Sequence, residues 1–222
     1  MQYQFSCISS TYIEIEKTIS VQRIGRYFAE AKGDKNRALR LYVWNASICE
    51  SFYLPNQLLE VAIRNRLHVV LAAHFGQNWH VNNSFVSPLP NRLQTGITNA
   101  IRDCTRDHGA GMTINHIVGS LSLGFWNHLL TSNFDTILWS NGMTAAFPYV
   151  PNGMSRQNIY DRVDQFRNWR NRIAHHGAIF DKRPMRELKN IQEIMSWVCP
   201  HTLWFMNEIN SVHRVLGRKP VR

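Results

Sequence analysis

The segment RVDQFRNWRNRIAHHGAIF, residues 162–180, is the densest polar stretch of the chain and has the spacing of an amphipathic helix. At about 100° per residue, the apolar residues in and just before it fall on a single stripe: Ile159, Val163, Phe166 and Ile173. Arg170 falls in the middle of this stripe, on the face that should be buried. A buried Arg without a partner is strongly destabilising. We therefore expect Arg170 to meet an anion, a carboxylate or another chain.

The end of this helix collects polar groups that could act together. Asn171 and His175 are four residues apart and share one face, with Arg167 one turn before them. Arg170 and His175, in contrast, point about 140° apart on a straight helix. They can share a phosphate only if the helix distorts near its end, or if a second copy of the helix faces it in a two-fold dimer. The alternative is that Arg170 pairs with a carboxylate of the core and that the two histidines lie on the surface at the helix end.

Two histidines, His175 and His176, stand directly before Gly177. We expect Gly177 to be the residue that caps the helix, because glycine adopts the left-handed conformation common at helix ends. The carbonyl end of a helix favours a protonated imidazole, so both histidines occupy a position that stabilises their charged form.

The remainder of the chain also has helical periodicity, and no alternating strand pattern of useful length occurs. Residues 77–90, which hold two Pro and several Asn and Ser, are expected to form a loop. We interpret residues 1–222 as one all-α domain, with residues 1–19 and 217–222 flexible at its ends. The expected helices cover about 21–31, 34 or 36 to 52, 55–75, 91–108, 113–131, 133–146, 155–176, 184–198 and 201–216.

The composition indicates a globular chain with a polyanionic partner. Hydrophobic residues make up 44% of the 222 residues, which excludes a disordered chain, and the formal net charge of +10 favours nucleic acid, anionic lipid or a nucleotide as a partner. The four Cys residues are far apart and form no CxxC pair, which favours reduced thiols in a cytoplasmic protein. The longest apolar run, residues 69–73, is too short to span a membrane, and the first residues lack a signal-peptide pattern. We therefore expect no membrane partner.

Common enzyme signatures are missing from the chain: GxxxxGK[ST], GxGxxG, GxSxG and HExxH are all absent. Carboxylates are few and scattered, whereas a two-metal nuclease needs several acidic ligands close together. We therefore expect no metal and no cofactor. Glu60 and Arg64 lie four residues apart, and an ordinary helix ion pair is the default interpretation of this spacing.

Four blocks of the chain, taken together, resemble a known family. The run from Arg170 to His175, RNRIAH, is similar to the R-x4–6-H motif of HEPN ribonucleases, with the preferred polar residue directly after the Arg. The wider chain resembles the Abi-like proteins of bacterial abortive infection. The blocks that carry this likeness occur in order: VQRIGRYFAEAKGDKNRALRLYVWN, LLEVAIRNRL, LSLGFWNHLL and RNRIAHHGAIF.

The resemblance implies a HEPN-like helical bundle with additional helices and metal-independent cleavage of RNA. His175 would act as general base or acid, with His176 as the alternative, while Arg170 would bind the scissile phosphate and Asn171 would orient His175 or a phosphate oxygen. RNA would supply the nucleophile, its 2′-OH. Further RNA contacts are assigned to Arg167 and Arg172. In the same likeness Glu60 pairs with Arg170 instead of Arg64, and both Glu60 and Arg64 are supporting residues.

The partners that the resemblance implies are RNA, a second copy of the chain in a homodimer, and an antitoxin or other component of phage defence. Gly177 stands where related toxins that are silenced by nucleotidyl transfer often have Tyr, which argues against that form of control. Two other functions remain open at this point. One is a non-catalytic module that binds RNA or a nucleotide with the same Arg and His groove. The other is a helical scaffold protein whose basic face meets an acidic partner.

Overall fold

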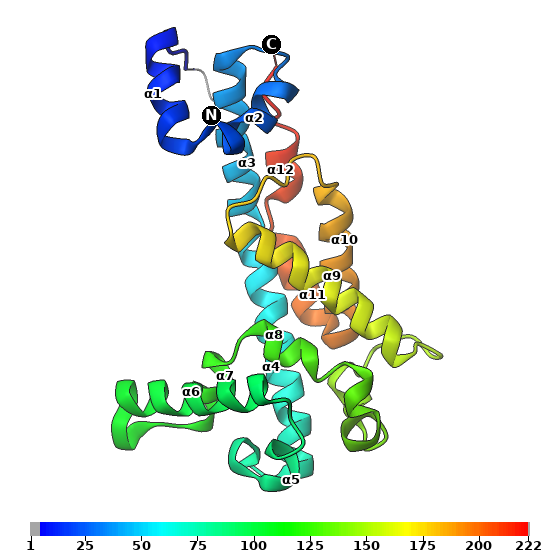
Figure 1. Ribbon diagram of the computed structural model, residues 1–222. Helices are drawn as coiled ribbons and strands as arrows, with labels where there is room; N and C mark the ends of the chain where they lie inside the picture. Colours follow the sequence, from blue (N-terminus) through cyan, green and yellow to red (C-terminus); the bar gives the residue numbers. More distant parts are fainter. Residues whose placement is uncertain (1–4, 222) are drawn as a thin grey trace.

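The computed structural model describes residues 5–221, and all regular secondary structure in this range is helical, which confirms the all-α prediction. Two long helices, α3 (Lys35–Ser51) and α4 (Tyr53–Phe75), follow one another down the centre of the molecule (Figure 1). Asp34 begins α3, because its carboxylate accepts the backbone N–H of Arg37. Gly76 ends α4 with a φ of +83°. Asp34 is one of the two start residues that the sequence allows, and Gly76 is the predicted end.

Three helices gather around one end of α3 (Figure 1): α1 (Ser9–Ile19), α2 (Val21–Glu30) and α12 (Val212–Leu216). The expected flexibility of residues 1–19 and 217–222 stays a prediction. Within the described range, α1 is a regular helix whose Tyr12 is buried, and Lys219 forms an ion pair with Glu30 at 2.8 Å. Apolar and charged contacts thus join α1 and Lys219 to the neighbouring helices α2 and α3. The outermost residues, 1–4 and 222, lie outside the described range.

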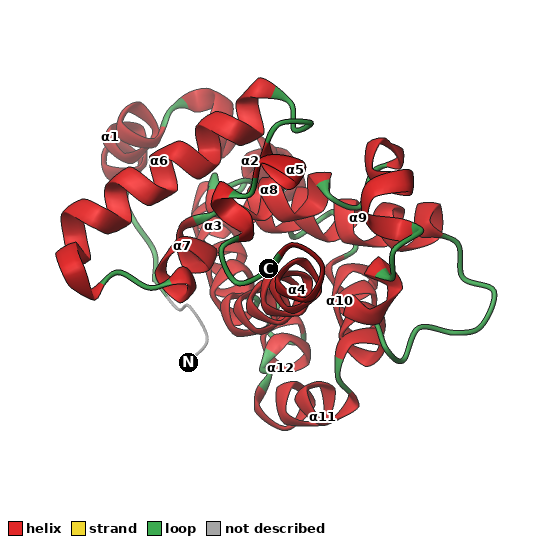
Figure 2. Cartoon of the chain, turned by 90° about the horizontal axis from the view of Figure 1, so that it is seen from below, coloured by secondary structure: helices red, strands yellow, loops and turns green. Residues whose placement is uncertain are grey.

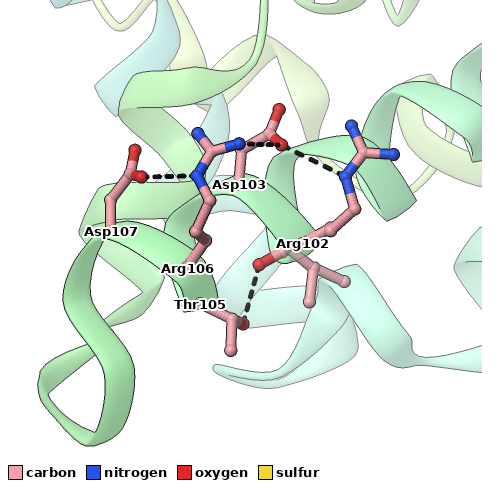
Figure 3. A network of polar contacts seen from close by, with 6 residues as sticks. Arg102, Asp103, Thr105, Arg106 and Asp107 are labelled. Carbon is pink, nitrogen blue, oxygen red and sulfur yellow. Dashed lines mark hydrogen bonds and ion pairs between the residues drawn. The ribbon is translucent and has the colours of Figure 1, made fainter.

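A helical arm projects from one side of α4 (Figure 1). Its elements are η1 (Trp79–Val81), α5 (Asn83–Val86), α6 (Asn91–His108), η2 (Gly109–Gly111) and α7 (Ile114–Ser120). The outer face of α6 carries a ladder of alternating charges, Arg102, Asp103, Arg106 and Asp107, with N–O distances between 2.9 and 3.6 Å (Figure 3). Solvent screens these pairs, so the ladder adds little to stability.

The region after this arm is more broken than the periodicity predicts. The expected helix over 113–131 is divided into α7 and α8 (Leu123–His128), because Leu121 leaves the helical conformation and the Ser122 hydroxyl caps the next helix. The expected helix over 133–146 is also absent, and Gly142 interrupts it with a φ of +95°. Three short helical segments take its place: the 3₁₀-helices η3 (Ser132–Phe134) and η5 (Met143–Ala146) and the π-helix η4 (Asp135–Trp139).

Three helices lie on the other side of α4 from the arm (Figure 2): α9 (Arg156–Ala174), α10 (Pro184–Val198) and α11 (Pro200–Ile209). Helix α9 packs against α8 and α10, and α10 packs against α4 and α11. Ser155 begins α9 through a capping box with Asn158, as expected. The expected helix over 201–216 is divided into α11 and α12, because the Asn210 side-chain amide bonds to two carbonyls of the last turn of α11.

The connection after α4 contributes to the main hydrophobic core, although the sequence predicts an ordinary loop over 77–90. Trp79 and Phe85 are each 0% exposed. The Trp79 indole N–H donates to Nδ1 of His68 on α4 at 3.0 Å. Burial lowers the pKa of the His68 imidazole, so the neutral ring that accepts this bond is favoured. The connection is therefore a packed part of the fold.

The four cysteines are free thiols, as expected from their spacing. Burial raises the pKa of the Cys49 thiol to about 11, so it stays protonated near neutral pH. No helix within residues 5–221 has the length and apolar character that a membrane crossing requires.

We predict that the protein loses stability as the pH falls below about 6.5, the ordinary imidazole pKa. The folded-state pKa of His68 is lowered, so the unfolded chain binds the additional proton first and the unfolding free energy decreases with falling pH. Burial also lowers the pKa values of His80 and His128, which act in the same direction. Thermal melts between pH 8 and pH 5 measure the effect. His68→Gln keeps an acceptor for Trp79 without a titrating ring, so its melting temperature should depend less on pH than that of the wild type. An unchanged pH dependence in this variant would contradict the assignment to His68.

Candidate functional site

Arg170 lies near the end of α9 and pairs with Glu60 of α4. Its Nε lies 2.9 Å from Oε2 of Glu60, and its Nη1 donates to the side-chain oxygen of Asn171 at 3.4 Å. The Arg170 side chain is 38% exposed and the Glu60 side chain 18% exposed. Arg170 therefore lies at the edge of the apolar stripe and not inside the core, where the helical spacing placed it. Its partner is a carboxylate, and Glu60 binds Arg170 in place of the Arg64 expected from spacing alone.

A cleft of about 390 Å³ opens between α4 and α9 beside this ion pair. Arg64 lines it together with Glu60 and Arg170, and the Arg64 side chain also donates to the carbonyl of Gly119 on α7 at 3.4 Å. Two guanidinium groups face one carboxylate here, so the cleft carries a positive charge. Apolar walls raise the effect of such charges on an incoming anion. The apolar part of the lining is Val61, Ile173 and Ala174.

The two predicted histidines form the end of α9 and are both exposed. His176 adopts the left-handed conformation, with a φ of +55°, and its N–H donates to the carbonyl of Ile173. The N–H of Gly177 donates to the carbonyl of Arg172 at 2.8 Å, which completes a Schellman cap. The left-handed residue is therefore His176, and not Gly177 as expected. Gly177 is needed for a different reason, because a Cβ there would lie 2.8 Å from Cγ of Arg172.

Helices α2 and α3 hold the chain where it leaves this cap. Arg23 of α2 donates through Nη1 to the carbonyl of His176 at 2.8 Å. The buried side chain of Asn45 on α3 accepts the backbone N–H groups of Ile179 and Phe180 at 2.8 and 3.1 Å. These bonds satisfy backbone groups that would otherwise be buried without a partner. They fix the path of the backbone at and directly after the two histidines.

No hydrogen bond or ion pair within the described residues joins the side chains of Arg170 and His175. The Asn171 side chain contacts Arg170, whereas its link to His175 is the helical backbone bond of 2.9 Å. The Asn171 side chain therefore contacts Arg170 in this structure, and its expected role, to orient His175 or a phosphate oxygen, stays a prediction. The helix keeps the two groups apart, in agreement with their predicted angular separation.

The two other predicted RNA contacts do not line the cleft. Arg167 binds Asp164 through Nε and Nη2 at 3.0 and 2.8 Å, and Asp164 also accepts the side-chain amide of Asn127 on α8. Arg167 thus belongs to a network that joins α9 to α8. Arg172 borders a separate hollow of about 450 Å³ on the α10 side of α9, where Trp169 is also found. The structure brings together Glu60, Arg64 and Arg170 but separates them from Arg167 and Arg172.

Sequence reasoning missed three residues of the cleft that carry polar groups, Tyr53, Asn56 and Gln57. Asn56 lies four residues before Glu60, so helical spacing places both on the same face of α4. That spacing was the available signal. A polar residue on this face is ambiguous, however, until the neighbouring helix is known.

Within residues 5–221, no group of three or more His, Cys, Asp or Glu side chains is placed to hold a metal ion. Comparison of the chain with known protein families, with curated proteins and with solved structures gives no match. The likeness to HEPN and Abi-like proteins therefore stays a prediction, and the geometry of the cleft and of the helix end is the basis for assigning a function.

We predict that His176→Gly raises the unfolding free energy by roughly 0.5–1 kcal/mol, because glycine adopts the left-handed conformation without strain. The strain that is relieved exceeds the cost of the larger entropy that glycine gives the unfolded chain. Gly177→Ala should lower the unfolding free energy, because its Cβ would crowd Cγ of Arg172 at 2.8 Å and its carbonyl oxygen at 3.0 Å. Denaturant titration measures both changes. Equal destabilisation by the two variants would contradict the cap described above.

Proposed function

We propose that this chain is a metal-independent endoribonuclease in which Arg170 binds the scissile phosphate and His175 transfers protons. One observation carries the proposal. Glu60 and Asn171 hold Nε and Nη1 of Arg170 at the edge of a positively charged cleft, and Nη2 makes no hydrogen bond within the described residues. A guanidinium that is fixed on one side and open on the other is suited to a phosphate oxygen. The resemblance to HEPN and Abi-like proteins supports the same assignment and extends the proposal to a HEPN-like bundle.

RNA supplies the nucleophile of this reaction. The imidazole of His175 accepts the proton of the ribose 2′-OH, the 2′-oxygen attacks phosphorus, and the bond from phosphorus to the 5′-oxygen breaks. The protonated imidazole or a water molecule donates a proton to the leaving 5′-oxygen, which becomes a 5′-OH. The other product is a 2′,3′-cyclic phosphate. Arg170 stabilises the negative charge that develops on the phosphate oxygens. His176, the next residue at the helix end, is the alternative group for the proton transfer.

A second copy of the chain is part of this proposal. Arg170 lies in the α4–α9 cleft, whereas His175 lies at the exposed helix end without a side-chain contact to it. A two-fold dimer through α9 would place His175 of one copy near Arg170 of the other. Sedimentation velocity tests the dimer, and a strictly monomeric protein that still cleaves RNA would contradict this arrangement.

The second candidate function is a binding module without catalysis. The observation that favours it is the Glu60–Arg170 ion pair itself, because a carboxylate at 2.9 Å neutralises much of the charge that a transition state would use. A scaffold with an acidic partner would use the same surplus of basic residues.

In the nuclease proposal the protein acts in the cytoplasm as the toxin of a phage-defence system, with an antitoxin as a further partner.

The decisive assay incubates the pure protein with 5′-labelled RNA in EDTA and identifies the ends of the products. We expect cleavage that survives chelation and leaves a 2′,3′-cyclic phosphate and a 5′-OH. Loss of cleavage in EDTA with recovery in Mg²⁺ or Mn²⁺ would overturn the mechanism. Binding of RNA without any cleavage would favour the binding module.

We predict that His175→Ala lowers the cleavage rate by about 10²–10⁴-fold, the range typical of a lost proton-transfer group. Arg170→Lys should also be severely impaired, because it keeps the charge but loses the planar fork that binds both Glu60 and phosphate.

Matched controls are available on α9 and α11, outside the cleft. Arg162→Lys alters another ion-paired Arg of α9, and His201→Ala alters an exposed histidine of α11. Both should cleave RNA at the wild-type rate, and thermal melts check that all four variants are folded. Wild-type rates in His175→Ala and Arg170→Lys would show that the active site lies elsewhere.

A further inference from the structure

Arg23 of α2 places a guanidinium beside the histidine end of α9. Its Nη1 donates to the carbonyl of His176 at 2.8 Å, although the two residues lie 153 positions apart in the chain. His175 and His176 are both exposed there. No hydrogen bond or ion pair within the described residues joins Arg170 to either imidazole. The cation that the fold brings to the histidine end is therefore Arg23.

Neighbouring contacts between α2 and the segment after α9 fix the position of Arg23. One turn further along α2, the ring of Tyr27 packs on the ring of Phe180, with their centroids 5.2 Å apart. Arg26 pairs with Asp181 across the same boundary at 3.3 Å. These contacts hold the backbone of α2 against the chain that leaves α9, so Arg23 stays next to the histidines before any ligand arrives.

Most of the hydrogen-bonding capacity of Arg23 is unused. A guanidinium has five N–H donors, and the carbonyl of His176 accepts one of them. Within the described residues no carboxylate forms an ion pair with Arg23, whereas Arg167 and Arg170 each have one. Capping of the helix end needs only the one donor. Arg23 therefore presents an uncompensated charge and free donors at an exposed position, which suits an anion.

The cleft between α4 and α9 leads to this position. Ala174, the last residue of α9, lines the cleft, and His176, whose carbonyl binds Arg23, follows two residues later. A strand that leaves the cleft past Ala174 comes next to Arg23.

We propose that Arg23 binds a second phosphate of the RNA strand, outside the cleft and at the histidine end of α9. The proposal rests on the proposed function and deepens it, because Arg170 holds the phosphate that is cleaved and Arg23 holds another phosphate of the same strand. Two phosphates held by separate guanidinium groups restrict rotation of the strand more than one does, which favours alignment of the 2′-OH with the imidazole.

A nucleic-acid backbone fits this position better than an acidic protein segment does. The guanidinium is open at the surface of a chain with a formal net charge of +10, and its planar fork matches phosphate oxygens. Every linkage of an RNA strand carries a negative charge, so a strand seated in the cleft brings further phosphates to the nearby surface. The carboxylates of a protein segment have no such fixed repeat.

The test measures binding of the full-length protein to a fluorescent, 2′-O-methylated RNA oligonucleotide by anisotropy, in EDTA and over a series of salt concentrations. Each phosphate contact of a single strand contributes about 0.7 to the slope of log affinity against log salt. We expect Arg23→Gln to reduce the magnitude of this slope by about 0.7. Arg23→Lys keeps the charge and should retain the wild-type slope. Thermal melts check that both variants are folded.

Arg92→Gln is the matched control. Arg92 is another exposed arginine, at the start of α6, and it forms no hydrogen bond or ion pair within the part of the chain that the structure describes. The control variant has the same net charge as Arg23→Gln, and its salt slope should equal that of the wild type. An equal loss of slope in the two variants would show that only net charge matters, which would overturn the proposal.

A second measurement locates the contact on the RNA. One linkage at a time in the oligonucleotide is replaced by a neutral methylphosphonate. We expect one linkage, different from the one that is cleaved in unmethylated RNA, whose replacement weakens binding to the wild type but not to Arg23→Gln. A residue that only caps the helix would show no coupling to a particular linkage.

A wild-type salt slope in Arg23→Gln, or the absence of a linkage coupled to Arg23, would overturn the phosphate site. Binding of poly-glutamate through Arg23 without binding of RNA would overturn it in favour of an acidic protein partner. These outcomes are independent of catalysis. If RNA cleavage fails while Arg23 is coupled to one linkage, the proposed nuclease activity is wrong and the phosphate site stands. If RNA is cleaved and no linkage is coupled to Arg23, the phosphate site is wrong and the nuclease proposal stands.

Discussion

The ion pair between Glu60 and Arg170 is the contact on which the candidate site depends, because it joins α4 to α9 across an open cleft. Arg170 is too exposed for this pair to be a major source of stability, and a value of about 1 kcal/mol or less is typical of such pairs. Its main effect is geometric. Glu60 occupies Nε, and Asn171 contacts Nη1, so the orientation of the guanidinium is set before any ligand arrives. A loose Arg at the same position would have to lose that freedom on binding.

The end of α9 shows the same kind of constraint. His176 adopts a left-handed conformation that glycine would adopt more easily, and Arg23 and Asn45 hold the backbone directly after it. Strained positions of this kind often coincide with functional sites. Ser20, Lys32 and Arg183, which lie outside the candidate site, also have a positive φ, so the left-handed conformation alone assigns no role to His176.

Helix boundaries can be predicted from the sequence where the boundary residue itself carries the signal. Burial and contacts that depend on how the helices pack against one another cannot be predicted in this way. Ser20, Asp34, Gly76 and Ser155 mark helix boundaries through their own chemistry, and the structure places boundaries there. Trp79 looks like a loop residue in the sequence, because its burial depends on how η1 packs against His68 of α4 and against Phe125 and Trp126 of α8. In the site, the burial argument leaves an anion, a carboxylate or another chain open as the partner of Arg170, and only the structure identifies Glu60. Asn56 could not be assigned to the cleft from the sequence, because its surroundings are formed by α9, more than a hundred residues later.

The most direct test of this account is a structure of the protein bound to an RNA oligonucleotide whose 2′-OH groups are methylated, so that it cannot be cleaved. The account predicts a phosphate on the open Nη2 side of Arg170, with the bond from Nε to Glu60 retained. It also predicts an imidazole of His175 or His176, from the same or a second copy, next to the blocked 2′-oxygen of that nucleotide. RNA bound along another surface, with no phosphate in the cleft between α4 and α9, would contradict the account.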